Sequence, residues 1–111
     1  MGTTKFYHIA YYRSGKNSPI TDYIDSKNDA EKAKIAFYID LLEEKGLKLK
    51  RPYCAYMRDK IWELRPEAGM EKSRVFYFFK GKLIVFVHAV DKKDFKQKDI
   101  SLAVNRMMEL L

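Results

Sequence analysis

Two arginines and a glutamate lie close together in the middle of this 111-residue chain, in a pattern that suits phosphate chemistry. Arg65 ends a short alternating segment that also carries Glu63, and Arg74 opens the next apolar segment after one turn. A guanidinium group can bind two phosphate oxygens at once, so arginines at facing strand ends could hold one phosphate between them. The alternative is that both are solvated charges at strand ends.

A carboxylate and a histidine near these arginines are candidates for proton transfer. Glu63 is predicted on the same strand face as Arg65 and could act as a general base, although the neighbouring cations would lower its pKa. The alternative for Glu63 is a plain cross-strand ion pair. His88 ends the last apolar segment, and an unperturbed imidazole titrates near neutral pH. The alternative for His88 is a hydrogen-bonded residue at a strand edge.

Positive charge is concentrated in the last third of the chain. The net charge is +7, and positions 72–98 contain eight Lys or Arg against two acids. Such a concentration favours a phosphate-rich partner, of which nucleic acid is the first to consider. Lys93 could also donate a proton if its neighbours lower its pKa. The candidates for binding phosphates are Lys60, Lys92, Lys96 and Lys98, for which the alternative is ordinary basic loops.

The strands that must position these residues follow from composition and alternation. Residues 73–79 and 83–91 are rich in β-branched and aromatic side chains, and Lys80-Gly81-Lys82 between them is typical of a hairpin turn. Residues 5–13 predict a first strand, and residues 66–71 predict a turn. Residues 60–65 alternate strictly and predict a further strand before the hairpin.

Three helices are predicted, over residues 19–26, Asp29–Lys45 and residues 98–111. Asn28, with Glu31 three positions later, resembles a capping box at the start of the long helix. The expected buried stripe of that helix consists of Ala30, Ala33, Phe37 and Leu41, with Tyr38 and Leu42.

Together these elements predict an α+β fold, in which a small, mainly antiparallel sheet has its helices packed on one face and its other face open to a ligand. Residues 1–111 are expected to form one domain. Trp62 and Leu64 should be buried, whereas Arg65 and Arg74 should be exposed on the other side of the sheet. Residues 47–57 are predicted to be a basic loop.

Composition also bears on cofactors and cell compartment. Cys54 is the only cysteine, which excludes an internal disulfide and a zinc site built from several cysteines. The scattered histidines and acids make no metal signature, so we expect metal-independent chemistry without a cofactor. A lone cysteine and the lack of an apolar run of about 18 residues favour the cytoplasm over a membrane.

Several segments, in their order and spacing, resemble the phage-derived branch of the RelE/HigB toxins over nearly the whole chain. They are Tyr11-Tyr12-Arg13, Ser18-Pro19-Ile20, Trp62-Glu63-Leu64-Arg65, Arg74-Val75-Phe76-Tyr77-Phe78-Phe79, the strand ending in His88, Lys92-Lys93, and Ala103 with Arg106-Met107. The resemblance implies a RelE-like α+β fold. It also implies the toxin of a type II toxin–antitoxin system, which inhibits translation by cleaving mRNA.

As an expectation from this resemblance, the chain is a metal-independent endoribonuclease that acts on mRNA in the ribosomal A site, near 16S ribosomal RNA. A cognate antitoxin, expected to be a helix-turn-helix DNA-binding protein, would neutralise it. Relatives have a catalytic basic residue at about the position of Lys93, so Lys93 is the first candidate. Asp91 departs from the pattern by adding a negative charge beside the cations. The alternative is a non-catalytic RNA- or DNA-binding module, or an inactive toxin relative that acts through protein contacts.

Overall fold

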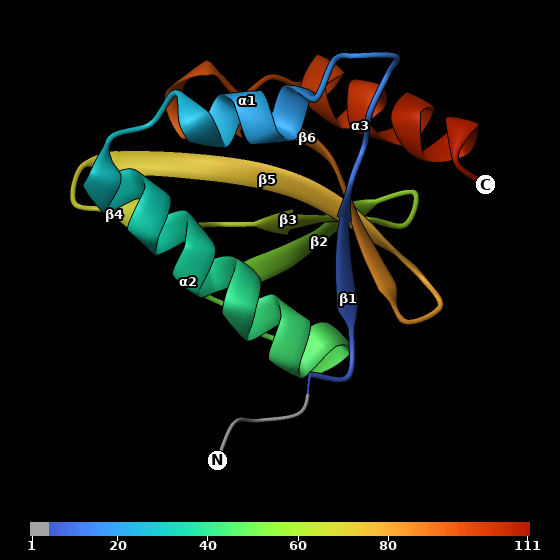
Figure 1. Ribbon diagram of the computed structural model, residues 1–111, viewed down its shortest axis with the longest axis horizontal. Helices are drawn as coiled ribbons and strands as arrows, with labels where there is room; N and C mark the ends of the chain where they lie inside the picture. The colour runs from blue at the N-terminus through green and yellow to red at the C-terminus, as the bar shows by residue number, and fades with distance from the viewer. Residues whose placement is uncertain (1–4) are drawn as a thin grey trace.

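The computed structural model describes residues 5–111, in which six strands form one sheet and three α-helices pack on it (Figure 1). The strand order is β1-β6-β5-β3-β2, with β4 paired to the start of β5. Only β1 is parallel to its neighbour; the other pairs are antiparallel. The predicted α+β class with a mainly antiparallel sheet is therefore confirmed. The strands are β1 (His8–Tyr11), β2 (Cys54–Arg58), β3 (Ile61–Leu64), β4 (Glu67–Ala68), β5 (Glu71–Lys80) and β6 (Leu83–Asp91).

The hairpin of β5 and β6 is the central feature of the sheet, as predicted. Its register pairs Lys80 with Leu83, which leaves a two-residue turn. Gly81 supplies the positive φ of 60° that such a turn requires at no steric cost. A bulge between Phe76 and Tyr77 bends β5.

One strand was missed in the predicted loop of residues 47–57, where the structure has β2 and a short 3-10 helix, η1 (Gly46–Lys48). The turn that joins β2 to β3 has positive φ at both Asp59 (51°) and Lys60 (70°). Such turns usually carry Asn-Gly or Asp-Gly, so Asp59-Lys60 gives no hairpin signal in the sequence. The short β4 likewise lies inside the predicted turn of residues 66–71.

The three predicted helices are all present, within one or two residues at each end. They are α1 (Pro19–Asp25), α2 (Asp29–Lys45) and α3 (Gln97–Glu109), and a second 3-10 helix, η2 (Lys92–Asp94), precedes α3. The side chain of Asn28 accepts a hydrogen bond of 2.9 Å from the backbone N–H of Glu31, as the capping pattern predicts.

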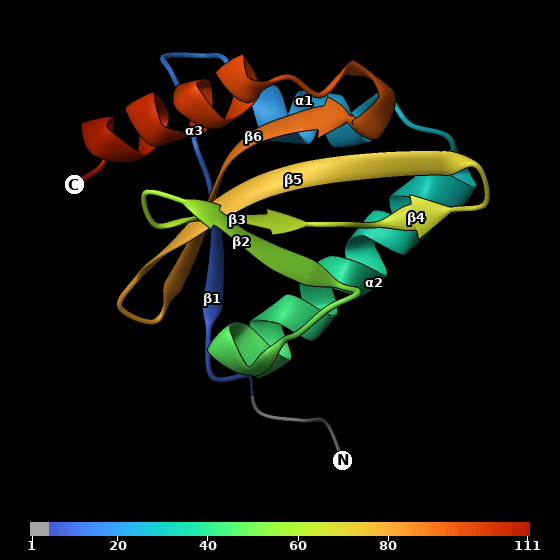
Figure 2. The ribbon, with the colours of Figure 1, turned by 180° about the vertical axis from the view of Figure 1, so that it is seen from behind.

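The helices lie on both faces of the sheet, which corrects the expectation that they all cover one face. Successive strand residues point to opposite faces. Tyr12 donates a hydrogen bond of 2.6 Å to Glu109 of α3, whereas the pKa of its neighbour Tyr11 is raised by burial and by Glu43 of α2. Figure 1 accordingly shows α1 and α2 in front of the sheet, and Figure 2, from behind, shows α3 in front. Amphipathic periodicity marks the apolar side of a helix but not the sheet face on which it docks.

The buried side of α2 also differs from the predicted stripe. Ile35 and Leu42 are fully buried, whereas Phe37 is 53% exposed. Apolar residues occur around most of this helix, so periodicity alone does not select the side that packs on the sheet. Of the two predicted core residues of β3, Leu64 is fully buried and Trp62 is half-buried. Among the described residues, no helix is long and apolar enough to span a membrane.

We use the name arginine face for the sheet face that carries Glu63, Arg65 and Arg74. Alternation along β3 places Glu63 and Arg65 on the face opposite Leu64. Helix α3 covers part of this face, against β6 and the middle of β5. In Figure 2 no helix stands in front of β3, β4 or the start of β5. The uncovered part of the sheet is therefore the part that holds the two arginines.

The end of α2 gives a stability prediction. A Cβ on Gly46 would lie 2.0 Å from the ring of Tyr7, whereas one on Gly81 would meet no atom within 4 Å; both glycines have positive φ. We expect Gly46→Ala to lower the free energy of unfolding by about 1–3 kcal/mol more than Gly81→Ala, because only Gly46→Ala adds overpacking to backbone strain. Urea unfolding measures both. Equal losses would show that Tyr7 moves aside without cost.

Candidate functional site

Two guanidinium groups converge on one carboxylate on the arginine face. Arg65 Nε lies 3.5 Å from Glu63 Oε1, and Arg74 Nε lies 3.7 Å from the same oxygen. The cause is the register of β3 and β5, which pairs Leu64 with Val75 and so continues with Arg65 opposite Arg74. The expectation that the two arginines share a face therefore agrees with this geometry.

The burial of this cluster differs from the sequence prediction. Arg74 was expected to be exposed, but it is only 2% exposed; Glu63 is 7% exposed, and Arg65 is half-buried. Strand alternation predicts on which sheet face a side chain lies, but not whether other segments bury that face. Here β4 and η2 both contact β5, and Glu67 of β4 lies 3.7 Å from Arg74 Nη2.

Both arginines keep polar atoms without a hydrogen-bond partner. Arg74 Nη1 donates a hydrogen bond of 2.8 Å to the backbone oxygen of Ser73, but the buried Arg74 Nη2 and Arg65 Nε have no partner. Buried donors are almost always satisfied, and leaving one unsatisfied costs about 1–3 kcal/mol. Arg65 Nε lies nearest Glu63 and Arg74 Nη2 nearest Glu67, and neither forms a hydrogen bond there, so each can take a further acceptor such as a phosphate oxygen.

Burial changes the expected pKa of Glu63. The sequence suggested that nearby cations would depress it, but desolvation dominates and raises the pKa above 4.5, against the lowering effects of Arg74, Arg65, Arg51 and Lys92 in that order. A carboxylate with a raised pKa is a better general base than an ordinary one. Burial lowers the pKa of Arg74, and the charge of Glu63 opposes this shift. The guanidinium group nevertheless stays protonated, as arginine does throughout in proteins.

The two lysines of η2 lie near different partners. Lys92 is one of the cations that lower the pKa of Glu63, whereas Lys93 acts on Asp91 and lowers its pKa. Both side chains are exposed. The structure thus brings Lys92 toward the arginine cluster and leaves Lys93, the first catalytic candidate, beside Asp91.

Asp91, which departs from the RelE/HigB pattern, is paired with residues on the sheet face opposite to the arginine face. Lys27 forms an ion pair with it, and the hydroxyl of Tyr23 donates to Asp91 at 2.6 Å and accepts from the hydroxyl of Ser73 at 2.9 Å. This network joins α1 to the ends of β5 and β6. The negative charge of Asp91 is therefore balanced on the α1 side and does not face Glu63.

Three predicted phosphate-binding lysines lie outside the arginine cluster. Lys60 is in the β2–β3 turn, at the end of β3 opposite to Arg65. Lys96 caps the start of α3, and Lys98 follows in its first turn. All three are exposed, so they remain available for more distant phosphates of a long ligand.

His88 is held by α3 and does not contact the arginines. Its Nε2 lies 2.8 Å from Asp99 Oδ1, and its ring stacks on Phe76 with the centroids 5.9 Å apart. The register pairs Glu63 with Phe76 and Phe76 with His88, so Phe76 separates the two candidate proton-transfer groups. Burial lowers the pKa of His88, and Asp99 opposes this shift.

Sequence reasoning missed three charged residues near the cluster. Arg51 acts on the pKa of Glu63, Glu67 pairs with Arg74, and Lys72 is two positions before Arg74 on β5. Side chains two positions apart on a strand share a face, so alternation along β5 places Lys72 on the same face as Arg74. The sequence pattern could therefore have predicted Lys72 as a site residue. Arg51 and Glu67 lie in segments predicted to be irregular, where no periodicity assigns a face.

The pair formed by His88 gives a pH prediction. The folded pKa of His88 is lowered from 6.5, so the unfolded chain takes up a proton at a higher pH than the folded chain. The free energy of unfolding should therefore fall as the pH drops from about 6.5 through the folded pKa. Urea unfolding midpoints measured between about pH 5 and 8, where histidine titrates, should depend less on pH for His88→Gln than for wild type. His8→Gln, at an exposed position, should keep the wild-type dependence of the midpoint on pH.

Comparison with known proteins gives one family. The sequence profile of the phage-derived Gp49-like proteins (DUF891) matches residues 22–108, and the chain belongs to this family. The family is phage-derived and toxin-like, and its context is that of toxin–antitoxin systems. A search of the curated proteins finds no match. The described residues contain no cluster of three or more His, Cys, Asp or Glu side chains that could hold a metal ion.

Proposed function

We propose that this member of the Gp49-like family is the toxin of a type II toxin–antitoxin pair and a ribosome-dependent endoribonuclease that cleaves mRNA. The observation that carries the proposal is the convergence of Arg65 and Arg74 on the buried Glu63, with guanidinium N–H groups left unpaired. The toxin-like family supports the biological setting. The RelE/HigB resemblance supports the substrate, mRNA in the ribosomal A site.

In the proposed reaction the 2′-oxygen attacks the adjacent phosphorus and the bond from phosphorus to the 5′-oxygen breaks. Glu63 takes the proton of the 2′-hydroxyl, a role that its raised pKa favours. Arg65 and Arg74 stabilise the charge on the pentacoordinate phosphorus through their unpaired donors. The products are a 2′,3′-cyclic phosphate and a free 5′-hydroxyl.

The 5′-oxygen leaving group must gain a proton from a donor on the other side of the phosphorus. Lys93 is our candidate because of the RelE/HigB resemblance, and it is exposed on the short η2, one residue after Lys92. His88 is the second candidate, although it must first give up its contact with Asp99. No metal ion takes part in this scheme. The protein partner is a cognate antitoxin, expected to be a helix-turn-helix protein, and the setting is the cytoplasm.

One observation favours a second function, a basic module that binds RNA or DNA without cutting it. Arg74 is almost fully buried and lies between two carboxylates, those of Glu63 and Glu67. If these carboxylates keep the arginine from the phosphate, the exposed lysines still bind nucleic acid but no bond is cleaved.

Induced expression in a bacterial host separates the two functions. The toxin should arrest growth, a neighbouring helix-turn-helix protein should restore it, and 5′-end mapping should find cuts only in translated messages. Growth arrest without cleavage of any message would support the binding module instead.

Arg65 gives the cleanest test of the catalytic role, because its side chain is 26% exposed and its loss leaves Arg74 to balance Glu63. We expect Arg65→Ala to fold and to lower the cleavage rate by a factor of about 10²–10³, the usual cost of one such donor. Arg65→Lys should restore little, since an ammonium group does not replace the planar fork. Lys16→Ala, at an exposed position, is the control. Normal cleavage by a stable Arg65→Ala protein would remove the residue from the site.

Arg74 needs a different design because of its burial. Removing it alone leaves Glu63 with only the partly exposed Arg65, and breaking a buried pair costs about 3–5 kcal/mol. Arg74→Lys keeps the charge, and Arg74→Met combined with Glu63→Gln removes both charges. Both proteins should fold but lose cleavage, which circular dichroism and 5′-end mapping measure. Wild-type cleavage by the double variant would overturn the proposed mechanism.

The pH dependence of cleavage tests Glu63 as the base. Because Arg65 lowers the pKa of Glu63, Arg65→Gln should move the acid limb of kcat/KM to higher pH while lowering the rate. Exposed Lys34→Gln, on α2, should leave the limb in place. An acid limb that does not respond to Arg65→Gln would assign it to another group.

A further inference from the structure

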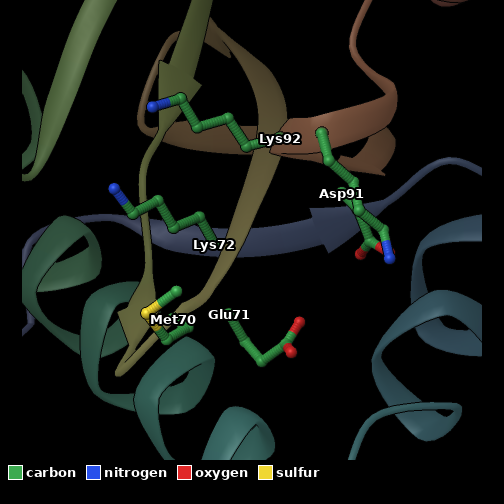
Figure 3. Close-up of a pocket in the computed structure, with 6 residues that line it drawn as sticks. Met70, Glu71, Lys72, Asp91 and Lys92 are labelled. Carbon is green, nitrogen blue, oxygen red and sulfur yellow. The ribbon is translucent and has the colours of Figure 1, made fainter.

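A pocket lies beside the arginine cluster, where β5 begins and β6 passes into η2 (Figure 3). Its volume is about 210 Å³. The residues that line it are Met70, Glu71, Lys72, Asp91, Lys92 and Lys93. Met70, at its rim, is 94% exposed, which places a flexible apolar side chain next to charged ones.

The charges of this pocket are separated in space. Figure 3 shows the side chains of Lys72 and Lys92 directed to one side, and the carboxylates of Glu71 and Asp91 directed to the other. Asp91 is already engaged by Lys27 and Tyr23. The two lysines therefore form a positive edge that the acids of the pocket do not neutralise.

Lys72 of β5 and Lys92, the first residue of η2, are neighbours just beyond the last residue pair of β5 and β6. The register pairs Ser73 with Asp91, so the next position places Lys72 opposite Lys92. Like charges directly opposite each other destabilise a strand pair. Within residues 5–111, neither amine has a carboxylate within 4.0 Å; Glu67, which pairs with Lys72 in register, directs its ion pair to Arg74. An anion bound between the amines would remove this repulsion.

The lysine pair extends the arginine face. Lys72 and Arg74 are two residues apart on β5 and so share a face at a separation of about 7 Å along the strand. This separation is similar to that between consecutive phosphates of an extended nucleic-acid strand. Lys92 also reaches this face, since Figure 3 shows its side chain directed to the same side as that of Lys72.

We propose that Lys72 and Lys92 form a second phosphate site, which binds the single-stranded RNA phosphate next to the one held by Arg65 and Arg74. The inference rests on the proposed function for the identity of the neighbouring phosphate. It adds a requirement for the substrate: a dinucleotide with one phosphate fills only half of the site, and a phosphate on the adjoining nucleotide fills the rest.

The test is binding of a fluorescent single-stranded RNA with 2′-O-methyl groups throughout, which cannot be cleaved, to the whole protein without ribosomes. Each lost phosphate contact lowers the slope of log K against log salt by about 0.7 for a single strand. We expect this loss from Lys72→Ala and from Lys92→Ala, and about twice the loss from the double variant. The matched control, Lys34→Ala, removes an exposed lysine from α2 on the opposite face and should keep the wild-type slope.

A scan with neutral methylphosphonate linkages then locates the contact. In wild type, one neutral linkage beside the position that Arg65→Ala affects should weaken binding; in the double lysine variant the same linkage should have no further effect. The site is refuted if RNA does not bind at low salt, if Lys34→Ala acts like Lys72→Ala, or if every linkage acts additively with the lysine changes. Lysine-dependent binding without ribosomal cleavage would refute the proposed function and leave this site standing, whereas cleavage that is unchanged in the double variant would refute the site alone.

Discussion

The buried ion cluster of Glu63, Arg65 and Arg74 is the interaction on which the candidate site depends. A carboxylate that is 7% exposed is tolerable only because two guanidinium groups approach one of its oxygens. The approach is fixed by the register of β3 and β5, which in turn is fixed by Leu64 and Val75 in the core. A shift of β3 by one residue would send Glu63 and Arg65 to the apolar side of the sheet, away from Arg74 on β5. The same packing that makes the fold unique therefore presents the groups that we propose to bind phosphate.

The arrangement of the helices determines which part of the sheet can meet a ligand. Helices α1 and α2 cover one face, and α3 covers the middle of the other, where His88 and Asp99 hold its first turn against β6. Asp99 also accepts a hydrogen bond of 2.7 Å from the backbone N–H of Lys96, so one carboxylate fixes both the sheet contact and the helix start. That contact sets where η2 ends and so where Lys92 emerges. We interpret His88 as a residue that positions the basic segment.

Alternation and turn chemistry predicted the hairpin of β5 and β6, the α+β class and the shared face of Glu63, Arg65 and Arg74. These features depend on neighbours in sequence or on a single strand pair. Burial of Arg74 could not be predicted, because it depends on β4 and η2, which carry no periodic signal. The same limit applies to the pKa of Glu63, where desolvation outweighs the cations that the sequence shows.

The net charge of the sequence does not show which charged groups are free to attract a ligand. The acids around the candidate site illustrate this. Asp91 is balanced by Lys27 and Glu63 by two arginines, while Asp99 is hydrogen-bonded to His88. Each of these carboxylates is thus occupied within the fold, whereas Lys72 and Lys92 are not. A desolvated ion pair attracts strongly at short range and contributes little field beyond it. The unpaired amines of the half-buried Lys72 and the exposed Lys92 act over about a Debye length. In the proposed function, Lys72 and Lys92 would therefore attract the RNA, and the buried arginines would act once a phosphate has arrived beside them.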